Sequence, residues 1–560
     1  MSVFLIVLFL LLLLSVPLFV LLGTVTALGY VIFGDVGSLL DVGLAENIRE
    51  LTDKAPLLAV PFFVLSGAIM SNGAIASRLV AVARTVFASV PGGLGIAAVA
   101  ACTFFAAISG SSPVTVITIG GIMYPAMVKA GYPKRFALGL VTSAGTLGII
   151  IPPSIPMIVY AIFASGSQVI QVEELFLAGI GPGLLIATLL SIYCFVVGWR
   201  MGERFHLPDV RAIRKAMGEG FWSLMLPVII LGGIYSGLYT ATEAAAVSVV
   251  YALVVELFIH RELTISQVPK VFGEATVLMG SLLVIFAVAV SLNTLLSDLS
   301  IPERAAAWII SLDLTPVTFL LVLNGFLLIV GCLMDIMSAI MILVPLLVPM
   351  GALCGVDPVH LGLIFIVNLE IGYLTPPMGL NLFVSSSLFK EPLGVVVRSV
   401  VPFTGVLLAA LLIVTYVPTV ALGPVNWLKD RPFYAPFPQG EVCKVEGEEE
   451  EGGLFGAPPP VAAPTTEAQG VKSLEDLMKE SNYDDAFDDK PAAPSSGPKS
   501  LQDLMKEGNY EDAFDDAPKA PPSAAPDTRP KSLQDLMKEG NYEDAFDDAP
   551  ASAEAPASAP

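Results

Sequence analysis

Charged residues are scarce in this chain: they make up 14% of its 560 residues, whereas hydrophobic residues make up 55%. An ordinary soluble protein carries about 25% charged residues. Two long stretches, residues 3–33 and 91–128, hold no charge at all. Because about 20 apolar residues span a bilayer, this scarcity excludes an ordinary soluble protein and predicts a multi-pass membrane protein.

Histidine and cysteine, which build many catalytic and metal sites, are also few. The three histidines lie far apart, and none forms a triad with a neighbouring acid. The chain lacks a phosphate-binding loop, a metal-ligand cluster and a nucleophile elbow, which argues against an ATP-driven pump and against an enzyme. The five cysteines show neither metal-site nor disulfide spacing. We therefore expect no cofactor, and we expect all the cysteines to be small apolar filling residues.

The amino-terminal apolar stretch has no basic residues before it. It is also longer than the apolar core of a signal peptide, which has about 7–15 residues. We therefore interpret it as a retained first membrane span.

The net charge of −21 is concentrated near the carboxyl terminus. Residues 441–560 contain 28 acidic and 10 basic residues, a balance of −18, whereas residues 1–440 contain 22 and 19, a balance of −3. Such acidity argues against binding to nucleic acid or to anionic lipid. We therefore divide the chain into a transmembrane body, residues 1–430, and an acidic tail, residues 431–560.

An 18-residue unit occurs three times in the tail, at residues 472–489, 499–516 and 531–548. The Pro-, Ala-, Asp- and Glu-rich composition around the copies predicts disorder. Within a unit, Ser500 and Asp503 form a capping-box pattern at the start of a short helix that is marginal alone. Either the units fold on an unidentified partner that offers a basic groove with an apolar floor, or the repeat expanded without function.

Apolar segments of the body predict about 11 full spans and two re-entrant hairpins in the lipid bilayer. The densest basic loop, residues 200–215, should lie in the cytoplasm by the positive-inside rule. Arg398 and the pair Lys429 and Arg431 flank opposite ends of the last span, so their charges cancel. The charge pattern therefore leaves the side of the carboxyl-terminal tail open.

Glycine and proline positions recur in the body after 224 residues. The aligned pairs are Pro125 with Pro349, Gly131 with Gly355, Gly148 with Gly372, Pro152 with Pro376, and Pro153 with Pro377. A Pro-Pro pair breaks a helix, and unwound backbone at membrane depth is tolerated only inside protein or beside a cavity. Paired interruptions in two halves are typical of the substrate and ion site of a transporter, although two simple kinks are the alternative.

Five motifs occur in a fixed order within residues 1–425: Ser109–Gly120 with Tyr124–Met127, Ala144–Met157, Thr242–Val247, Gly331–Asp335, and Gly372–Phe383. Together they make the chain resemble the large membrane subunit of tripartite ATP-independent periplasmic (TRAP) transporters, the DctM-like family. The resemblance implies an all-α polytopic membrane protein with inverted repeats around residues 92–200 and 316–425. In that fold, two re-entrant hairpins and two broken helices slide as an elevator against a fixed scaffold.

The resemblance also implies a function in the bacterial inner membrane. Members of the family use a sodium gradient to take up an organic anion, such as a C4-dicarboxylate. A periplasmic binding protein delivers the substrate, and a small membrane subunit completes the scaffold. The alternatives are a stand-alone ion-coupled carrier of the same superfamily and a membrane scaffold that recruits partners through its tail.

The resemblance places two sodium sites, each between a hairpin tip and a broken helix. Hard cations prefer oxygen ligands, which unwound carbonyls and hydroxyls supply. Ser111 and Ser112 also suit simple close packing of helices. The candidates for sodium are Ser109, Ser111, Ser112, Gly148 and Pro152 in one half, and Met334, Asp335, Gly372, Thr375 and Pro376 in the other. The candidates for the substrate are Ser112, Thr115 and Asn381, although Thr and Asn often bond only to backbone or to a neighbouring helix.

Three acidic residues, Glu243, Asp335 and Glu370, lie inside apolar stretches. A charge there costs at least about 2.5 kcal/mol on insertion scales, so each should face a cavity or a partner. The 224-residue shift aligns Asp335 with Ser111, and we expect Asp335 to support an ion site. For Glu243 and Glu370 we expect a structural hydrogen bond or ion pair.

Overall fold

The computed structural model describes residues 18–33, 54–164, 170–377, 379–438 and 443. Within these residues every regular element is a helix. Six helices there are long and apolar enough to cross a membrane, or up to eight if each of two bent pairs counts as one span. The three tail repeats lie outside the described residues, so their predicted disorder and helices stay predictions.

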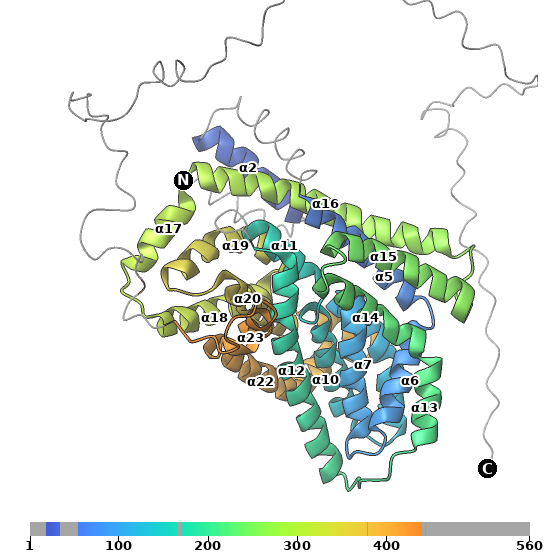
Figure 1. The fold of residues 1–560 in the computed structure, drawn as a ribbon. Helices are drawn as coiled ribbons and strands as arrows, with labels where there is room; N and C mark the ends of the chain where they lie inside the picture. The colour runs from blue at the N-terminus through green and yellow to red at the C-terminus, as the bar shows by residue number, and fades with distance from the viewer. Residues whose placement is uncertain (1–17, 34–53, 165–169, 378, 439–442, 444–560) are drawn as a thin grey trace, which may run out of the picture. The chain divides into compact units, whose positions relative to one another are not determined.

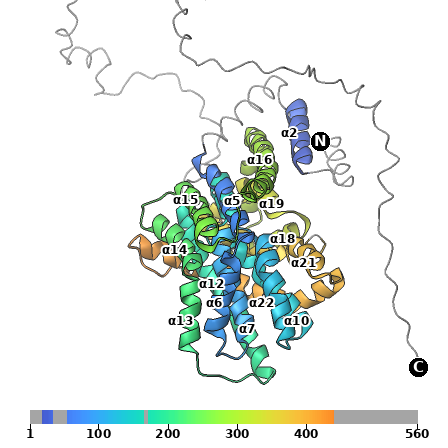
Figure 2. The same cartoon turned by 90° about the vertical axis from the view of Figure 1, so that its right-hand side faces the viewer.

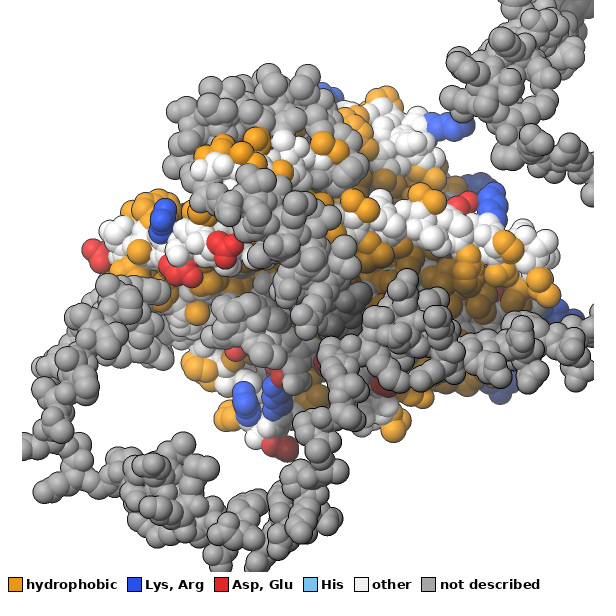
Figure 3. All heavy atoms as spheres, turned by 90° about the horizontal axis from the view of Figure 1, so that it is seen from above, with side chains coloured by type: hydrophobic (Ala, Val, Ile, Leu, Met, Phe, Trp, Pro, Cys, Tyr) orange, Lys and Arg blue, Asp and Glu red, His pale blue; other side chains and the backbone are white. Residues whose placement is uncertain are grey.

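A group of outer helices lies along one side of the body (Figure 1, Figure 2). It contains α2 (Leu18–Phe33), α5 (Ala59–Ser71), α14 (Phe221–Tyr235), α15 (Ala241–Val254), α16 (Val268–Asp298) and α17 (Ile301–Ile310). Helix α16 packs against both α2 and α5. Its other faces carry exposed apolar side chains, among them Val277 and Val284, and Figure 3 shows hydrophobic side chains across this surface. A helix that is apolar all round suits contact with lipid.

The first repeat folds as a hairpin followed by a broken helix. The hairpin consists of α7 (Gly93–Ser109), the single turn α8 (Ser112–Thr115), a π-helical segment (Val116–Gly120) and α9 (Gly121–Lys129). The broken helix consists of α10 (Lys134–Ala144), a 3-10 turn (Gly145–Ile149) and α11 (Ile155–Ala164). Its interruption is the Gly- and Pro-containing segment that the sequence singles out.

The second repeat has the same order of elements. Its hairpin is α18 (Pro316–Leu333) and α19 (Ile336–Leu353), and its broken helix is α20 (Pro358–Gly372) and α21 (Leu380–Phe389). The Pro-Pro bonds are cis in both halves. Gly131 and Gly355, which the 224-residue shift aligns, both have positive φ, at 93° and 67°. Glycine is favoured there because other side chains clash in that conformation.

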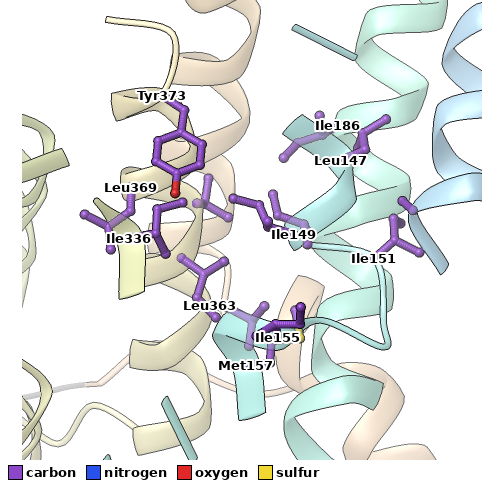
Figure 4. Close-up of a cluster of buried hydrophobic side chains, with 14 of the residues drawn as sticks. Leu147, Ile149, Ile151, Ile155, Met157, Ile186, Ile336, Leu363, Leu369 and Tyr373 are labelled. Atoms are coloured by element: carbon purple, nitrogen blue, oxygen red, sulfur yellow. The ribbon is translucent and has the colours of Figure 1, made fainter. Parts of the chain in front are cut away.

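The two repeats share one apolar core. Figure 4 shows Ile149 and Ile155 of the first broken helix on the side toward Ile336, Leu363 and Leu369 of the second half, with Leu147 on the other side of that broken helix. All six side chains are buried. Because lipid is as apolar as these side chains, close packing rather than exclusion of water holds them together, and it places both helix breaks in one core.

Three longer helices and two shorter ones complete the body. Helix α6 (Ile75–Phe87) follows α5 at a bend of 70°, and α12 (Val172–Arg200) packs against α7. Helix α13 (Val210–Glu219) packs on α6, whereas α22 (Leu393–Tyr416) and α23 (Thr419–Leu428) pack on α12. Several of the shorter helices fall below the length of a full crossing, so they join into broken or bent segments.

Candidate functional site

The tip of the first hairpin is a cluster of hydroxyl and carbonyl oxygens. Helix α7 ends at Gly110, whose φ of 57° turns the chain without a Cβ clash. The Ser109 and Thr115 hydroxyl oxygens lie 3.1 Å apart, and the Thr115 hydroxyl donates to the Ser111 carbonyl at 2.8 Å. Ser109 and Thr115 are buried. The tip therefore gathers oxygen atoms inside the protein, where they are suitable ligands for a hard cation.

The first broken helix touches this tip through Gly148. A Cβ at this position would lie 2.6 Å from the Ser111 carbonyl oxygen and 2.7 Å from the Thr115 hydroxyl oxygen. No other residue therefore fits without moving the tip. Pro152 follows in the same buried loop. The structure thus brings the predicted candidates of this half together.

The second hairpin meets the second broken helix by a similar glycine contact. A Cβ at Gly372 would lie 2.5 Å from the Gly331 carbonyl oxygen. Met334 is extended and forms the tip between α18 and α19. The Thr375 hydroxyl donates at 2.9 Å to a carbonyl one turn earlier, and Pro376 is exposed. Gly372 and the tip residue Met334 therefore lie near one junction, whereas Thr375 and Pro376 follow it in a more open segment.

Asp335 acts as the N-cap of α19. Its Oδ2 accepts hydrogen bonds from the Ser338 amide at 3.1 Å and from the Ser338 hydroxyl at 2.9 Å. Its Oδ1 accepts one from the Tyr373 hydroxyl at 3.0 Å. The carboxylate therefore ties the hairpin tip to the loop of the second broken helix. Ser111, its counterpart in the first repeat, is likewise an extended N-cap residue.

Two side chains from different repeats form a direct link at the centre. The Asn381 Nδ2 donates to the Ser112 hydroxyl at 2.6 Å, and both residues are fully buried. The Asn381 Oδ1 has no hydrogen-bond partner among the described residues. A buried amide oxygen without a partner is costly, so it is available to a ligand. Two of the three substrate candidates thus meet, while Thr115 belongs to the hairpin tip.

Glu370 is buried completely, and among the described residues neither carboxylate oxygen has a hydrogen bond of standard geometry. The 224-residue shift aligns Glu370 with Thr146, which lies beside the carboxyl group. The Thr146 hydroxyl, however, donates to the Ser143 carbonyl at 2.6 Å. Thr146 is therefore the neighbour placed to supply the structural hydrogen bond expected for Glu370, and that role stays a prediction.

Glu243 has the structural role that the sequence predicts. Its carboxylate accepts from the Thr240 amide at 2.8 Å, and the Thr240 hydroxyl oxygen accepts from the Glu243 amide. This capping box starts α15 at an exposed position. Glu243 therefore needs no partner inside the membrane.

Sequence reasoning missed a second fully buried acid besides Glu370, namely Glu256. Its two carboxylate oxygens accept hydrogen bonds from the Ala74 and Ile75 amides, at 3.0 and 2.9 Å. These amides begin α6, directly after its bend from α5. The signal was present, because Glu256 interrupts the same apolar segment that begins near Glu243.

Sequence reasoning also missed a series of side-chain hydrogen bonds between α18, α20 and α22. The Asn368 Nδ2 donates to the Asn324 Oδ1 at 2.7 Å, and the Asn324 Nδ2 donates to the Thr415 hydroxyl at 3.1 Å. All three residues are buried. Single amides within apolar runs were the only signal, and such residues often bond only within their own helix.

The expectation for the cysteines is wrong for two of them, because Cys354 and Cys443 form a disulfide. The pair is 89 residues apart, so no local spacing signals it. Only the return of the chain after α23 brings the two side chains together. Cys102 and Cys194 are buried and free, as expected.

The described residues contain no group of three His, Cys, Asp or Glu side chains that could hold a metal ion. Hydroxyl and carbonyl oxygens, in contrast, gather at the tip of the first hairpin. The Ser112–Asn381 hydrogen bond joins the tip of the first hairpin to the start of α21 in the second repeat.

Comparison with known proteins identifies relatives of the whole membrane body. Residues 5–420 match the family described as the DctM component of the tripartite ATP-independent periplasmic transporter. The chain is 46% identical over 387 residues to the C4-dicarboxylate TRAP transporter large permease protein DctM of Pseudomonas aeruginosa, which covers 69% of this chain and 90% of that protein. It is 34% identical over 415 residues to the ectoine/5-hydroxyectoine TRAP transporter large permease protein UehC of Ruegeria pomeroyi. That match covers 74% of this chain and 95% of that protein.

A solved structure has a similar fold. The YdaH transporter of Alcanivorax borkumensis superposes with a TM-score of 0.56 and covers 76% of this chain and 99% of that chain. The sequence identity is 14%, so this likeness concerns the fold alone.

Proposed function

Since the chain belongs to the DctM family of TRAP transporters and is a large permease subunit, we propose that it uses a sodium gradient to take up an organic anion across the bacterial inner membrane. The observation that carries this proposal is the contact of each hairpin tip with a glycine of a broken helix. In the first half, that contact concentrates the Ser109, Ser111 and Thr115 oxygens around Gly148.

The chemistry of these tips supports sodium coupling. Buried hydroxyls and unwound carbonyls are neutral oxygen donors, which suit a hard cation better than a transition metal. A bound cation would also lower the cost of bringing an anion to the centre of the membrane. The Ser112–Asn381 link supplies a hydroxyl and an unpartnered amide oxygen between the two halves.

The substrate class is proposed from the more similar of the two relatives, which is named for C4-dicarboxylates. The relative named for ectoine and 5-hydroxyectoine matches a longer stretch at lower identity. We therefore propose a C4-dicarboxylate-like carboxylate as substrate. The proposed partners are a small TRAP membrane subunit and a periplasmic binding protein, and the proposed motion is an elevator movement of hairpins and broken helices.

The test is uptake into proteoliposomes that contain this chain and the small membrane subunit. Labelled succinate is supplied with the cognate binding protein, under a sodium gradient or a matched potassium gradient. We expect uptake only when sodium and the binding protein are both present. Uptake without the binding protein would instead identify a stand-alone carrier, and equal uptake with potassium would refute sodium coupling.

A further inference from the structure

The chain does not leave the membrane body at the end of α23, because residues 429–438 fold back over it. The Thr419 hydroxyl oxygen accepts from the Ala435 amide at 3.1 Å, and the same hydroxyl lies 3.0 Å from the Ala435 carbonyl oxygen. The Phe437 ring lies 5.9 Å from the Tyr416 ring, measured between centroids. We call residues 429–438, together with Cys443, the return strap.

The far end of the return strap reaches both ends of the second hairpin. The Cys443 amide donates to the Leu314 carbonyl at 2.8 Å, just before α18 begins. Pro438 lies 3.6 Å from the position of a Cβ on Gly355, just after α19 ends. Cys354, the last residue before Gly355, forms the disulfide with Cys443. The strap is thus joined covalently to the base of the hairpin.

Helix α12 shows that the return strap and the basic loop lie at opposite ends of the body. Near its start, Glu174 forms an ion pair with Lys429 of the strap. Its last residue, Arg200, leads directly into the basic loop of residues 200–215 (Figure 1). The helix has 29 residues and, at about 1.5 Å per residue, exceeds the thickness of about 30 Å of a hydrocarbon core.

The basic loop also joins the base of the first hairpin. The Glu203 Oε2 accepts from the Gly92 amide at 2.7 Å and from the Tyr132 hydroxyl at 3.1 Å. Burial, with the hydrogen bond to Glu203, raises the pKa of Tyr132, so this hydroxyl remains a donor. Lys129, Lys134 and Arg135 flank the same turn. The positive-inside rule places this concentration of basic residues in the cytoplasm, and so the return strap lies on the periplasmic side.

The disulfide places the return strap on the periplasmic side by an independent argument. Disulfides persist in the oxidising periplasm, whereas cytosolic thiols are kept reduced. We propose that Cys354 and Cys443 form a periplasmic disulfide that fixes the return strap to the second hairpin and starts the acidic tail in the periplasm. Residues 444–560 contain no apolar run long enough to cross back, so the three repeats lie in that compartment. This inference rests on family membership but not on sodium coupling or on the substrate.

The Cys354 and Cys443 thiols are oxidised by thiol–disulfide exchange with the disulfide of a periplasmic protein. One cysteine thiolate attacks that disulfide and forms a mixed disulfide, and the thiolate of the other cysteine then displaces the oxidant. Cys354 and Cys443 together lose two electrons and two protons, and the oxidant becomes a dithiol. The acidic repeats would then face the compartment in which the proposed binding protein delivers substrate.

The Cys354–Cys443 disulfide is tested by counting free thiols. The full chain is expressed in a bacterial inner membrane, quenched in acid, denatured and treated with a polyethylene-glycol maleimide. We expect three modified cysteines without reductant and five with it, since five are present and two are paired. Cys443→Ser should show four without reductant, and the control Cys102→Ser should show two. Five modified cysteines in the unreduced wild-type chain would overturn the disulfide.

The compartment of the acidic tail is tested by labelling intact spheroplasts with a membrane-impermeant maleimide. A Ser523→Cys variant places one thiol between two tail repeats, and we expect it to be labelled before lysis. A Leu207→Cys variant is the matched control, because Leu207 is 96% exposed in the basic loop and should be labelled only after lysis. If both variants were labelled only after lysis, the tail would be cytoplasmic and the proposal wrong. Neither assay depends on transport.

Discussion

At the scale of single residues, the room around Gly148 constrains the first hairpin tip more than any charge does. Gly148 is the clearest case, because a Cβ there would penetrate both the Ser111 carbonyl and the Thr115 hydroxyl. Such overpacking typically costs about 1–3 kcal/mol. The neighbouring atoms are backbone and a short buried side chain, so they cannot simply swing away.

We predict that Gly148→Ala lowers sodium-dependent uptake roughly tenfold or more, since a functional site must be held to within about 0.5 Å. The matched control is Gly121→Ala in the same hairpin, where a Cβ would meet nothing within 4 Å. That control should transport like the wild type in the proteoliposome assay. Equal uptake by both variants would show that the tip contact is not part of the ion site.

The Ser112–Asn381 link gives a second prediction. Ser112→Ala should destabilise the fold by about 1–3 kcal/mol, because it leaves the buried Asn381 amide without its acceptor. Ser112→Ala with Asn381→Ala should cost less than the sum of the two single changes. Thermal unfolding of the detergent-solubilised protein measures both quantities. Ser281→Ala on exposed α16 is the control, since its hydroxyl bonds only within its own helix.

Among the site residues, those that break helices were predictable and those that pair across the fold were not. Gly148, Pro152 and their counterparts stand out because glycine and proline constrain the backbone wherever they occur. The N-cap role of Asp335 could not be assigned, because it depends on where α19 begins and on the distant Tyr373.

At the scale of elements, the bend between α5 and α6 is stabilised from outside. Glu256, near the end of the segment that begins with α15, accepts hydrogen bonds from the first two amides of α6. The first amides of a helix have no partner within the helix, and a carboxylate also interacts favourably with that end of the helix dipole. The bend is therefore set by a contact between elements far apart in sequence.

We predict that Glu256→Ala lowers the thermal unfolding temperature clearly more than Glu243→Ala does. The first change leaves two buried amides unsatisfied, at on the order of 1–3 kcal/mol each, whereas Glu243 caps an exposed helix end. The two variants are matched because both remove a carboxylate that caps a helix start. A larger loss in Glu243→Ala would contradict the proposed importance of the bend.

The number of complete spans was less predictable than the repeat. The recurrence of glycine and proline after 224 residues anticipated one interrupted helix in each half, and the described helices form a hairpin followed by a broken helix twice. Hydropathy alone, however, cannot separate a full span from a hairpin arm or half of a broken helix. In the described residues, six helices qualify as spans by length and composition, or eight with the bent pairs, compared with about 11 expected from apolar segments.

At the scale of the whole molecule, a disulfide joins the first part of the acidic tail to the second hairpin. The boundary inferred from composition lies at residue 430, yet the return strap continues to Cys443. A truncation after Asp430 therefore removes part of the packed body, whereas a truncation after Cys443 removes only the tail.

We predict that the chain truncated after Cys443 retains uptake close to that of the full chain. The chain truncated after Asp430 should lose on the order of 2–4 kcal/mol of stability, because it lacks a disulfide that closes a long loop. Thermal unfolding with and without reductant checks this difference, and reductant should lower the unfolding temperature of the chain ending at Cys443 but not that of the shorter chain. Loss of uptake in a well-folded chain ending at Cys443 would show that the tail belongs to the transport machinery.

The sequence by itself determined the class of the protein, the paired helix breaks and the separate character of the acidic tail. These properties follow from composition and from backbone constraints, which act wherever a residue stands. Only the tertiary structure decided which oxygens meet at the hairpin tips, which carboxylate caps α6, and which cysteines pair. Those depend on distances between residues remote in sequence, and such distances arise only when the apolar segments pack against one another.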